Sequence, residues 1–129
     1  PGIDLVPTEG AVTNAMYLRP TLRWTPPWLG GRVRIVGSAV FARAPQPVSD
    51  PYQSLVSGTR LNAFGAPAGQ AYGTEIDAAV SFRSKIADPV GIEVGVQAGH
   101  LFPGNAFRRA DGSNMPGITA TKLRATLLF

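Results

Sequence analysis

Basic side chains recur at every second position in several segments of this chain, a spacing that places them on one face of extended strands. Fixed positive charge offsets part of the hydration that an anion loses at a protein surface, so this spacing predicts an anion-binding face. The residues expected to form it are Arg19, Arg23, Arg32, Arg34, Arg83, Lys85, Lys122 and Arg124, with acidic Glu75, Asp77 and Glu93 among them. The alternative is that these charges pair with acids on strands missing from this chain and only keep that face hydrated.

Residues that support catalysis or metal binding are scarce. His100 is the single histidine and the chain has no cysteine, so we expect no metal site, no catalytic triad, no cofactor and no enzymatic activity. Glu75 and Asp77 share a strand face and could serve acid–base chemistry or bind Ca²⁺, but we expect them to pair with nearby basic groups. Basic residues among aromatics could also bind single-stranded nucleic acid. That reading leaves the alternating apolar residues unexplained, so no nucleic-acid partner is expected.

Strands are the elements that would position these groups, because apolar and polar residues alternate along the chain. We expect an all-β, antiparallel up-and-down meander of about five strands, within residues 16–25, 32–44, 72–85, 92–102 and 118–129. Pro20 interrupts the first segment, and proline cannot donate to a sheet ladder, so that strand should be an edge or carry a bulge. Val36 and Val40 break the alternation of the second segment.

Composition agrees with a sheet. The 129 residues suit one domain, and 15 glycines with 12 prolines favour short strands between turns over helices. No run approaches the roughly 18 apolar residues of a membrane-spanning helix. Residues 1–14 lack periodicity and are predicted to form a loop. The segment of residues 45–70 is too long for an ordinary connection between strands and is predicted to be a functional or flexible loop.

Connections between the predicted strands alternate between short turns, at residues 26–31 and 86–91, and long loops, at residues 45–70 and 103–117. Short periplasmic turns and longer extracellular loops are typical of outer-membrane β-barrels, whose strands alternate lipid-facing apolar and lumen-facing polar residues. The pattern predicts part of such a barrel, integral to a bacterial outer membrane, with each strand crossing in roughly 9 to 12 residues. The basic residues expected toward the periplasmic half are Arg23, Arg32, Arg34, Arg83 and Lys85, with Arg19, Lys122 and Arg124 nearer mid-depth.

Aromatic residues fall at both ends of the predicted strands, where rings settle at the depth of the lipid headgroups. The residues expected in these two girdles are Trp24, Phe82 and Phe129 on the periplasmic side and Phe41 and Phe102 on the outer side. Outer-membrane lipid is therefore an expected partner. Arg108 and Arg109 lie in the last outer loop, where they could contact lipopolysaccharide.

Two features resemble known membrane proteins. The last strand ends on Phe129 with apolar Leu123, Ala125 and Leu127 at alternate positions before it, which resembles the sorting signal of outer-membrane β-barrels and implies recognition by the barrel-assembly machinery. Residues 72–77 (YGTEID) and 95–107 (GVQAGHLFPGNAF) look like the closing hairpin of alginate-export-type outer-membrane proteins. This resemblance covers about residues 72–129. It implies a large monomeric barrel, passive passage of a solute or polysaccharide and, in the alginate-exporting members, an arginine-lined pore.

Five strands cannot close a barrel, because the smallest types need about eight. Since the chain begins at Pro1 without a methionine or signal peptide, we expect residues 1–129 to be the C-terminal segment of one larger barrel domain, or a subunit of a shared barrel. The expected function is porin-like, anion-preferring passage of solutes, with an anionic solute or polysaccharide as the cargo. The alternatives are a plugged structural or adhesive barrel, and a soluble β-sandwich or small barrel that binds an anionic ligand.

Overall fold

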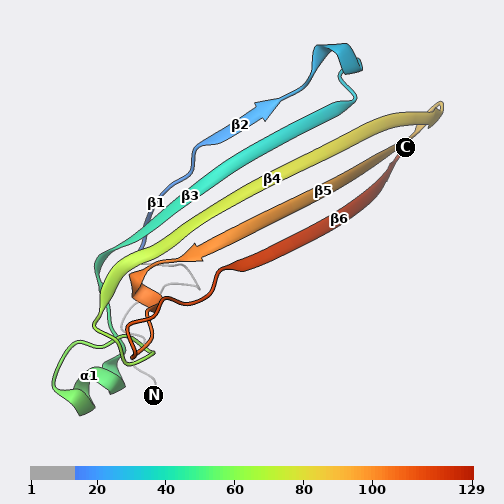
Figure 1. Cartoon of the computed structure of the whole chain (residues 1–129). Helices are drawn as coiled ribbons and strands as arrows, with labels where there is room; N and C mark the ends of the chain where they lie inside the picture. Colours follow the sequence, from blue (N-terminus) through green and yellow to red (C-terminus); the bar gives the residue numbers. More distant parts are fainter. Residues whose placement is uncertain (1–13) are drawn as a thin grey trace, which may run out of the picture.

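The computed structural model describes residues 14–129, and the loop predicted for residues 1–14 lies outside this range except for Asn14. The described chain is all-β, and its antiparallel sheet of six strands does not close on itself (Figure 1). Its strands are β1 (Met16–Leu18), β2 (Thr21–Trp24), β3 (Val33–Val48), β4 (Gly69–Ala87), β5 (Val90–Pro103) and β6 (Ile118–Leu128). They follow the order β1-β3-β4-β5-β6, with β2 also paired to β3, so the predicted antiparallel meander is confirmed.

The first predicted strand is divided in two, which raises the number of strands from about five to six. Leu18 pairs with Phe41 and Thr21 pairs with Ser38, so β1 and β2 keep one continuous register along β3. Pro20 lies between them and has no N–H to give to the ladder, although its carbonyl oxygen accepts from the amide of Ala39 at 3.1 Å. The predicted interruption at this edge of the sheet is therefore confirmed.

β3 and β4 are longer than the predicted spans, with 16 and 19 residues. Their additional length lies beyond a bulge, where Ala42 pairs with Gly73 but the next pair along β4 skips Tyr72. Gly73 has a φ of 136°, and a Cβ there would meet the carbonyl oxygen of Phe102, so the bulge requires glycine. The two strands thus continue past the regular sheet into the loops.

We call the end of the sheet where β3 joins β4 and β5 joins β6 the loop end, and the opposite end the turn end. Residues 45–70, predicted as a functional or flexible loop, include a short helix, α1 (Pro51–Ser57), at the loop end. Asp50 caps it by accepting a hydrogen bond from the amide of Gln53 at 2.8 Å, and Gly58 ends it in a left-handed conformation. Two 3-10 turns, η1 (Pro27–Leu29) and η2 (Asn105–Phe107), complete the helical content of the described residues. No helix among them is long and apolar enough to cross a membrane.

Most apolar side chains of the strands lie on one side of the sheet, which we call the apolar face. The exceptions on the opposite side include Val36, Val40, Leu101, Ile118 and Leu128. One row across the apolar face is formed by Trp24, Ile35, Val80, Val96 and Leu123. Residues 14–129 form one sheet and no second one, and α1 lies beyond the ends of the strands (Figure 1). The apolar face is consequently open: Leu123 is 79% exposed, and Ile76 53%.

The buried core is small and lies at the loop end, where Ala44, Asn62, Ala66 and Ala106 are at most 2% exposed. The Asn62 side chain donates to the carbonyl oxygens of Ala106 and Arg108 at 3.1 and 2.9 Å. Its Oδ1 accepts from the amides of Phe64 and Ala66 at 2.9 and 3.0 Å. One asparagine therefore joins the β3–β4 and β5–β6 loops, and the first of these is an ordered structure.

Candidate anion-binding face of the sheet

The side of the sheet opposite the apolar face, which we call the polar face, carries the predicted basic residues. Alternation and register place there Arg19, Arg23, Arg32, Arg34, Arg83, Lys85, Lys122 and Arg124. Val36 and Val40, which broke the alternation of the sequence, also lie on this face.

The rows of the polar face differ from the prediction that Lys122 and Arg124 lie nearer mid-depth than Arg23 and Arg34. Arg124 shares a row with Arg34, through Ser81 and Gly95 on the strands between them. Lys122 likewise shares a row with Arg23. The sequence separated residues that share a row because it counts positions from the end of each strand and contains no information on the stagger between strands.

A hollow of about 220 Å³ lies on the polar face between β3 and β6. Its lining includes the small residues Ala79, Ser81 and Gly95, which leave space between the longer side chains around them. Its rim is formed by Arg34, Glu93, Gln97, Lys122 and Arg124. Arg34 and Lys122 make no ion pair within residues 14–129, so both cations are free to attract an anion.

Glu93 pairs with Arg124 of the hollow and with Arg83, which lies outside it toward the turn end. Its Oε2 lies 2.8 Å from Nη2 of Arg83, and its Oε1 lies 3.2 Å from Nη2 of Arg124. One carboxylate therefore fixes two guanidinium groups from neighbouring strands and neutralises part of their charge. Both arginines are more than 60% exposed, so we attribute orientation to these pairs and little stability. Within the described residues, Arg83 and Arg124 are thus paired, while Arg34 and Lys122 are not.

Glu75 and Asp77 do not form the ion pairs predicted for them within the part of the chain that the structure describes. Asp77 lies opposite Ser38 and Gly99, and its Oδ2 is 3.4 Å from the Ser38 hydroxyl. Glu75 lies between Val40 and Leu101, so uncharged residues on the flanking strands leave both carboxylates without a basic neighbour in their rows. At the turn end, in contrast, Lys85 pairs with Asp88 at 3.5 Å on the surface.

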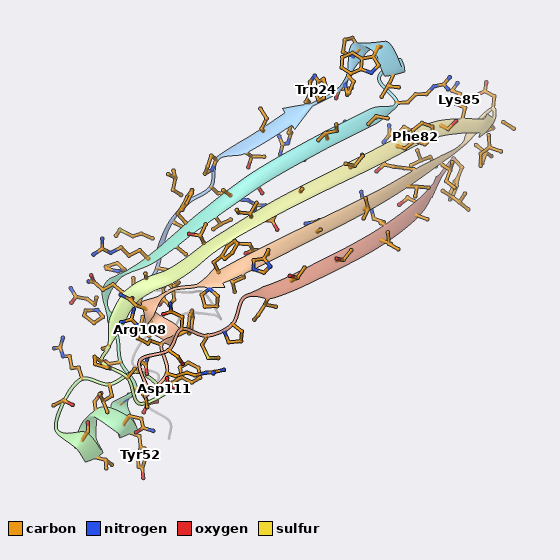
Figure 2. The ribbon with its side chains drawn as sticks, in the orientation of Figure 1. Trp24, Tyr52, Phe82, Lys85, Arg108 and Asp111 are labelled. Carbon is orange, nitrogen blue, oxygen red and sulfur yellow. The ribbon has the colours of Figure 1, made fainter. Side chains whose placement is uncertain are left out.

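The aromatic residues lie in two sets at opposite ends of the sheet. Trp24 and Phe82 lie at the turn end, together with Lys85 (Figure 2). Phe41 and Phe102 lie near the loop end, both in the row of Thr74. Phe129 follows β6 and is 97% exposed. Their arrangement has the geometry predicted for two girdles, and their role at a membrane interface stays a prediction.

His100 lies on the apolar face, where its Nδ1 is 2.7 Å from the Thr119 hydroxyl and its ring centroid is 4.4 Å from that of Phe102. Residues 14–129 contain no group of three or more His, Asp or Glu that could hold a metal ion. The polar face therefore carries charged and hydrogen-bonding side chains, and no cluster suited to metal chemistry among the described residues.

Two polar residues were missed by sequence reasoning. The alternation of its strand places Gln97 on the polar side, but the predicted site did not include it, and it contributes to the lining of the hollow. Asn62 lies in a segment without periodicity, so its burial had no sequence signal.

Comparisons with protein-family models, characterised proteins and solved structures found no match for this chain. Its function is therefore argued from the two faces of the sheet.

Proposed function

We propose that this sheet is part of the wall of a transmembrane β-barrel in a bacterial outer membrane, and that its polar face lines a pore that prefers anions. One observation carries the proposal: a single sheet has one mainly apolar face and one polar face rich in basic residues, and both are open. Soluble monomers rarely expose contiguous apolar patches larger than a few hundred Å². In a barrel wall, hydrocarbon covers the apolar face and water covers the polar face.

The edges of the sheet support a larger barrel. Among the described residues, β6 pairs only with β5, and β1 and β2 pair only with β3. Unpaired backbone groups in hydrocarbon are destabilised by several kcal/mol each, so further strands must complete the wall. We propose that they come from the same polypeptide or from other copies. An alginate-export-type barrel is the family we propose, on the resemblance of residues 72–77 and 95–107 to its closing hairpin.

The proposed orientation places the loop end outside the cell and the turn end in the periplasm. The longer connections, which include α1, then lie outside, as is usual for such barrels. Arg108 and Asp111 both lie at the loop end (Figure 2). Exposed arginines at this position are suited to the phosphates of lipopolysaccharide, which we propose as a partner together with the membrane lipid.

The anion preference is proposed from the unpaired cations of the hollow. The test is the reversal potential of the protein in a planar bilayer with different KCl concentrations on its two sides. This potential gives the ratio of chloride to potassium permeability. We expect chloride to be preferred. Preference for potassium in the intact protein would eliminate the anion channel.

Neutralising the two free cations of the hollow, by Arg34→Gln with Lys122→Gln, should lower the ratio of chloride to potassium permeability by roughly threefold to tenfold. In water, the electrostatic interaction energy between an ion and a fixed unit charge about 7 Å away is roughly 0.6 kcal/mol, and the double variant removes two such charges. The control is Arg108→Gln together with Arg109→Gln, which removes the same charge from the loop end. If both double variants change the ratio equally, the hollow has no special part in selectivity.

A plugged structural or adhesive barrel is the second candidate, and the ordered loop end favours it. The side chains of Tyr52 and Leu55 on α1 are 72% and 83% exposed there, as a contact surface would require. Single-channel recording separates the two proposals, because a plugged barrel inserts into the bilayer without conducting.

A further inference from the structure

Charge is divided along the polar face between the two ends of the sheet. Toward the loop end, the rows that contain Glu75 and Asp77 hold those two carboxylates and one cation, Arg19. Toward the turn end, the rows of Ala79, Ser81, Arg83 and Lys85 hold one acidic residue, Glu93. The basic residues of those rows are Arg23, Arg32, Arg34, Arg83, Lys85, Lys122 and Arg124. The polar face thus has an acidic zone and a basic zone in sequence along its strands.

The two zones do not neutralise each other within the described residues. Neither Glu75 nor Asp77 lies within ion-pair distance of a basic group, and the three ion pairs that do form lie at the turn end and in the hollow. Arg19 shares the row of Glu75 but is two strands away, which is roughly 10 Å at the usual strand spacing. The arginines at the loop end, such as Arg108, lie beyond the strands, where bulk water screens them (Figure 2).

The outer rows of the two zones are far enough apart to act separately. At about 3.3 Å per residue, Glu75 and Lys85 are roughly 33 Å apart along β4. The Debye length at physiological ionic strength is about 8 Å, so each zone gathers its own counterions: cations near Glu75 and Asp77, anions near the basic rows. The boundary between the zones falls next to a second hollow, which Asp77 and Lys122 both line.

We propose that this division of charge makes the pore a rectifier, which passes more current in one direction than in the other. The inference depends on the pore proposed above and adds a directional property to it. When the compartment at the loop end is positive, cations move from the acidic zone and anions from the basic zone toward the boundary, so mobile ions accumulate there and conductance rises. Opposite polarity draws both kinds of ion away from the boundary, and conductance falls.

The test is the current at equal and opposite voltages in symmetric KCl, with the complete protein in a planar bilayer. The chain has no cysteine, so Asn114→Cys at the loop end, blocked by a bulky membrane-impermeant thiol reagent from one side, defines the orientation of each channel. At 0.1 M KCl we expect the current to be about 1.5-fold or more larger with the loop end positive. At 1 M KCl the Debye length falls to about 3 Å, and the ratio should approach 1.

The variant that isolates the acidic zone is Glu75→Gln with Asp77→Asn, which changes neither size nor hydrogen-bonding shape greatly. It should bring the current ratio at 0.1 M KCl close to 1 while chloride preference is retained or increased. The control, Asp50→Asn, removes a loop-end carboxylate outside the polar face and keeps a good helix cap, so rectification should persist.

The outcomes distinguish this inference from the proposed function. An anion-preferring channel with equal currents in both directions would overturn rectification alone. Larger current with the loop end negative, or rectification that survives loss of both carboxylates, would also overturn it. A protein that does not conduct, or that prefers potassium, would overturn the pore proposal itself.

Discussion

An arginine at position 96 should greatly weaken insertion of this protein into a membrane, whereas an arginine at the neighbouring position 97 should be tolerated. Val96 lies on the apolar face near the middle of β5, and Gln97 lies on the polar face. A basic residue on the lipid-facing side of a barrel is destabilising by about 2–4 kcal/mol at the bilayer midplane. We therefore expect Val96→Arg to lower the free energy of unfolding from lipid vesicles by that amount, and Gln97→Arg to lower it by less than about 1 kcal/mol.

Urea titration of the protein in vesicles, followed by tryptophan fluorescence, measures both values, and Gln97→Arg serves as the matched control on the same strand. Equal tolerance of the two substitutions would contradict a lipid-facing apolar side. Folding of the wild-type protein to a stable monomer in buffer without detergent or lipid would also contradict it, and would favour the soluble alternative.

Replacing Asn62 by leucine should release the loop end while the strands stay paired. The substitution keeps the approximate volume but removes four hydrogen bonds, and it leaves the carbonyl oxygens of Ala106 and Arg108 and the amides of Phe64 and Ala66 without their partner. Unsatisfied buried groups are destabilising by about 1–3 kcal/mol each, and re-entry of water recovers part of this. We expect the loop end to lose roughly 3 kcal/mol or more of local stability.

Hydrogen exchange measures the effect where it should occur, at the amides of Phe64 and Ala66. Those amides should exchange about a hundredfold faster or more, since about 1.4 kcal/mol corresponds to a factor of ten. The amides in the middle of β4 and β5 should change little, because the two regions open separately. Asn114→Leu makes the same change at an exposed position of the same end and should have no such effect. Uniform acceleration across the sheet would show that Asn62 stabilises the whole fold and not the loop end.

Much of the sheet could be predicted because the pattern that specifies a strand is local. Alternation along residues 72–85 and 92–102 identified β4 and β5, and the same alternation assigned Val80 and Val96 to one face without knowledge of their neighbours. The interruption at Pro20 could be predicted, because a residue without an N–H interrupts the hydrogen bonds of a sheet ladder in any context. The signal for α1 was also present: Asp50 precedes Pro51, and Gly58 follows the helix, a pattern typical of helix ends. It was missed because the composition of the segment favoured a loop.

The sequence by itself determined that this chain forms antiparallel strands with one apolar and one basic face, because side-chain direction in a strand alternates with every residue. Tertiary structure alone decided which charges meet. The stagger between strands placed Arg124 beside Glu93, 31 residues away, and left Glu75 and Asp77 unpaired. It also buried Asn62 against Ala106, 44 residues along the chain. Such contacts depend on register and loop closure, and neither is encoded in the alternation of a single strand.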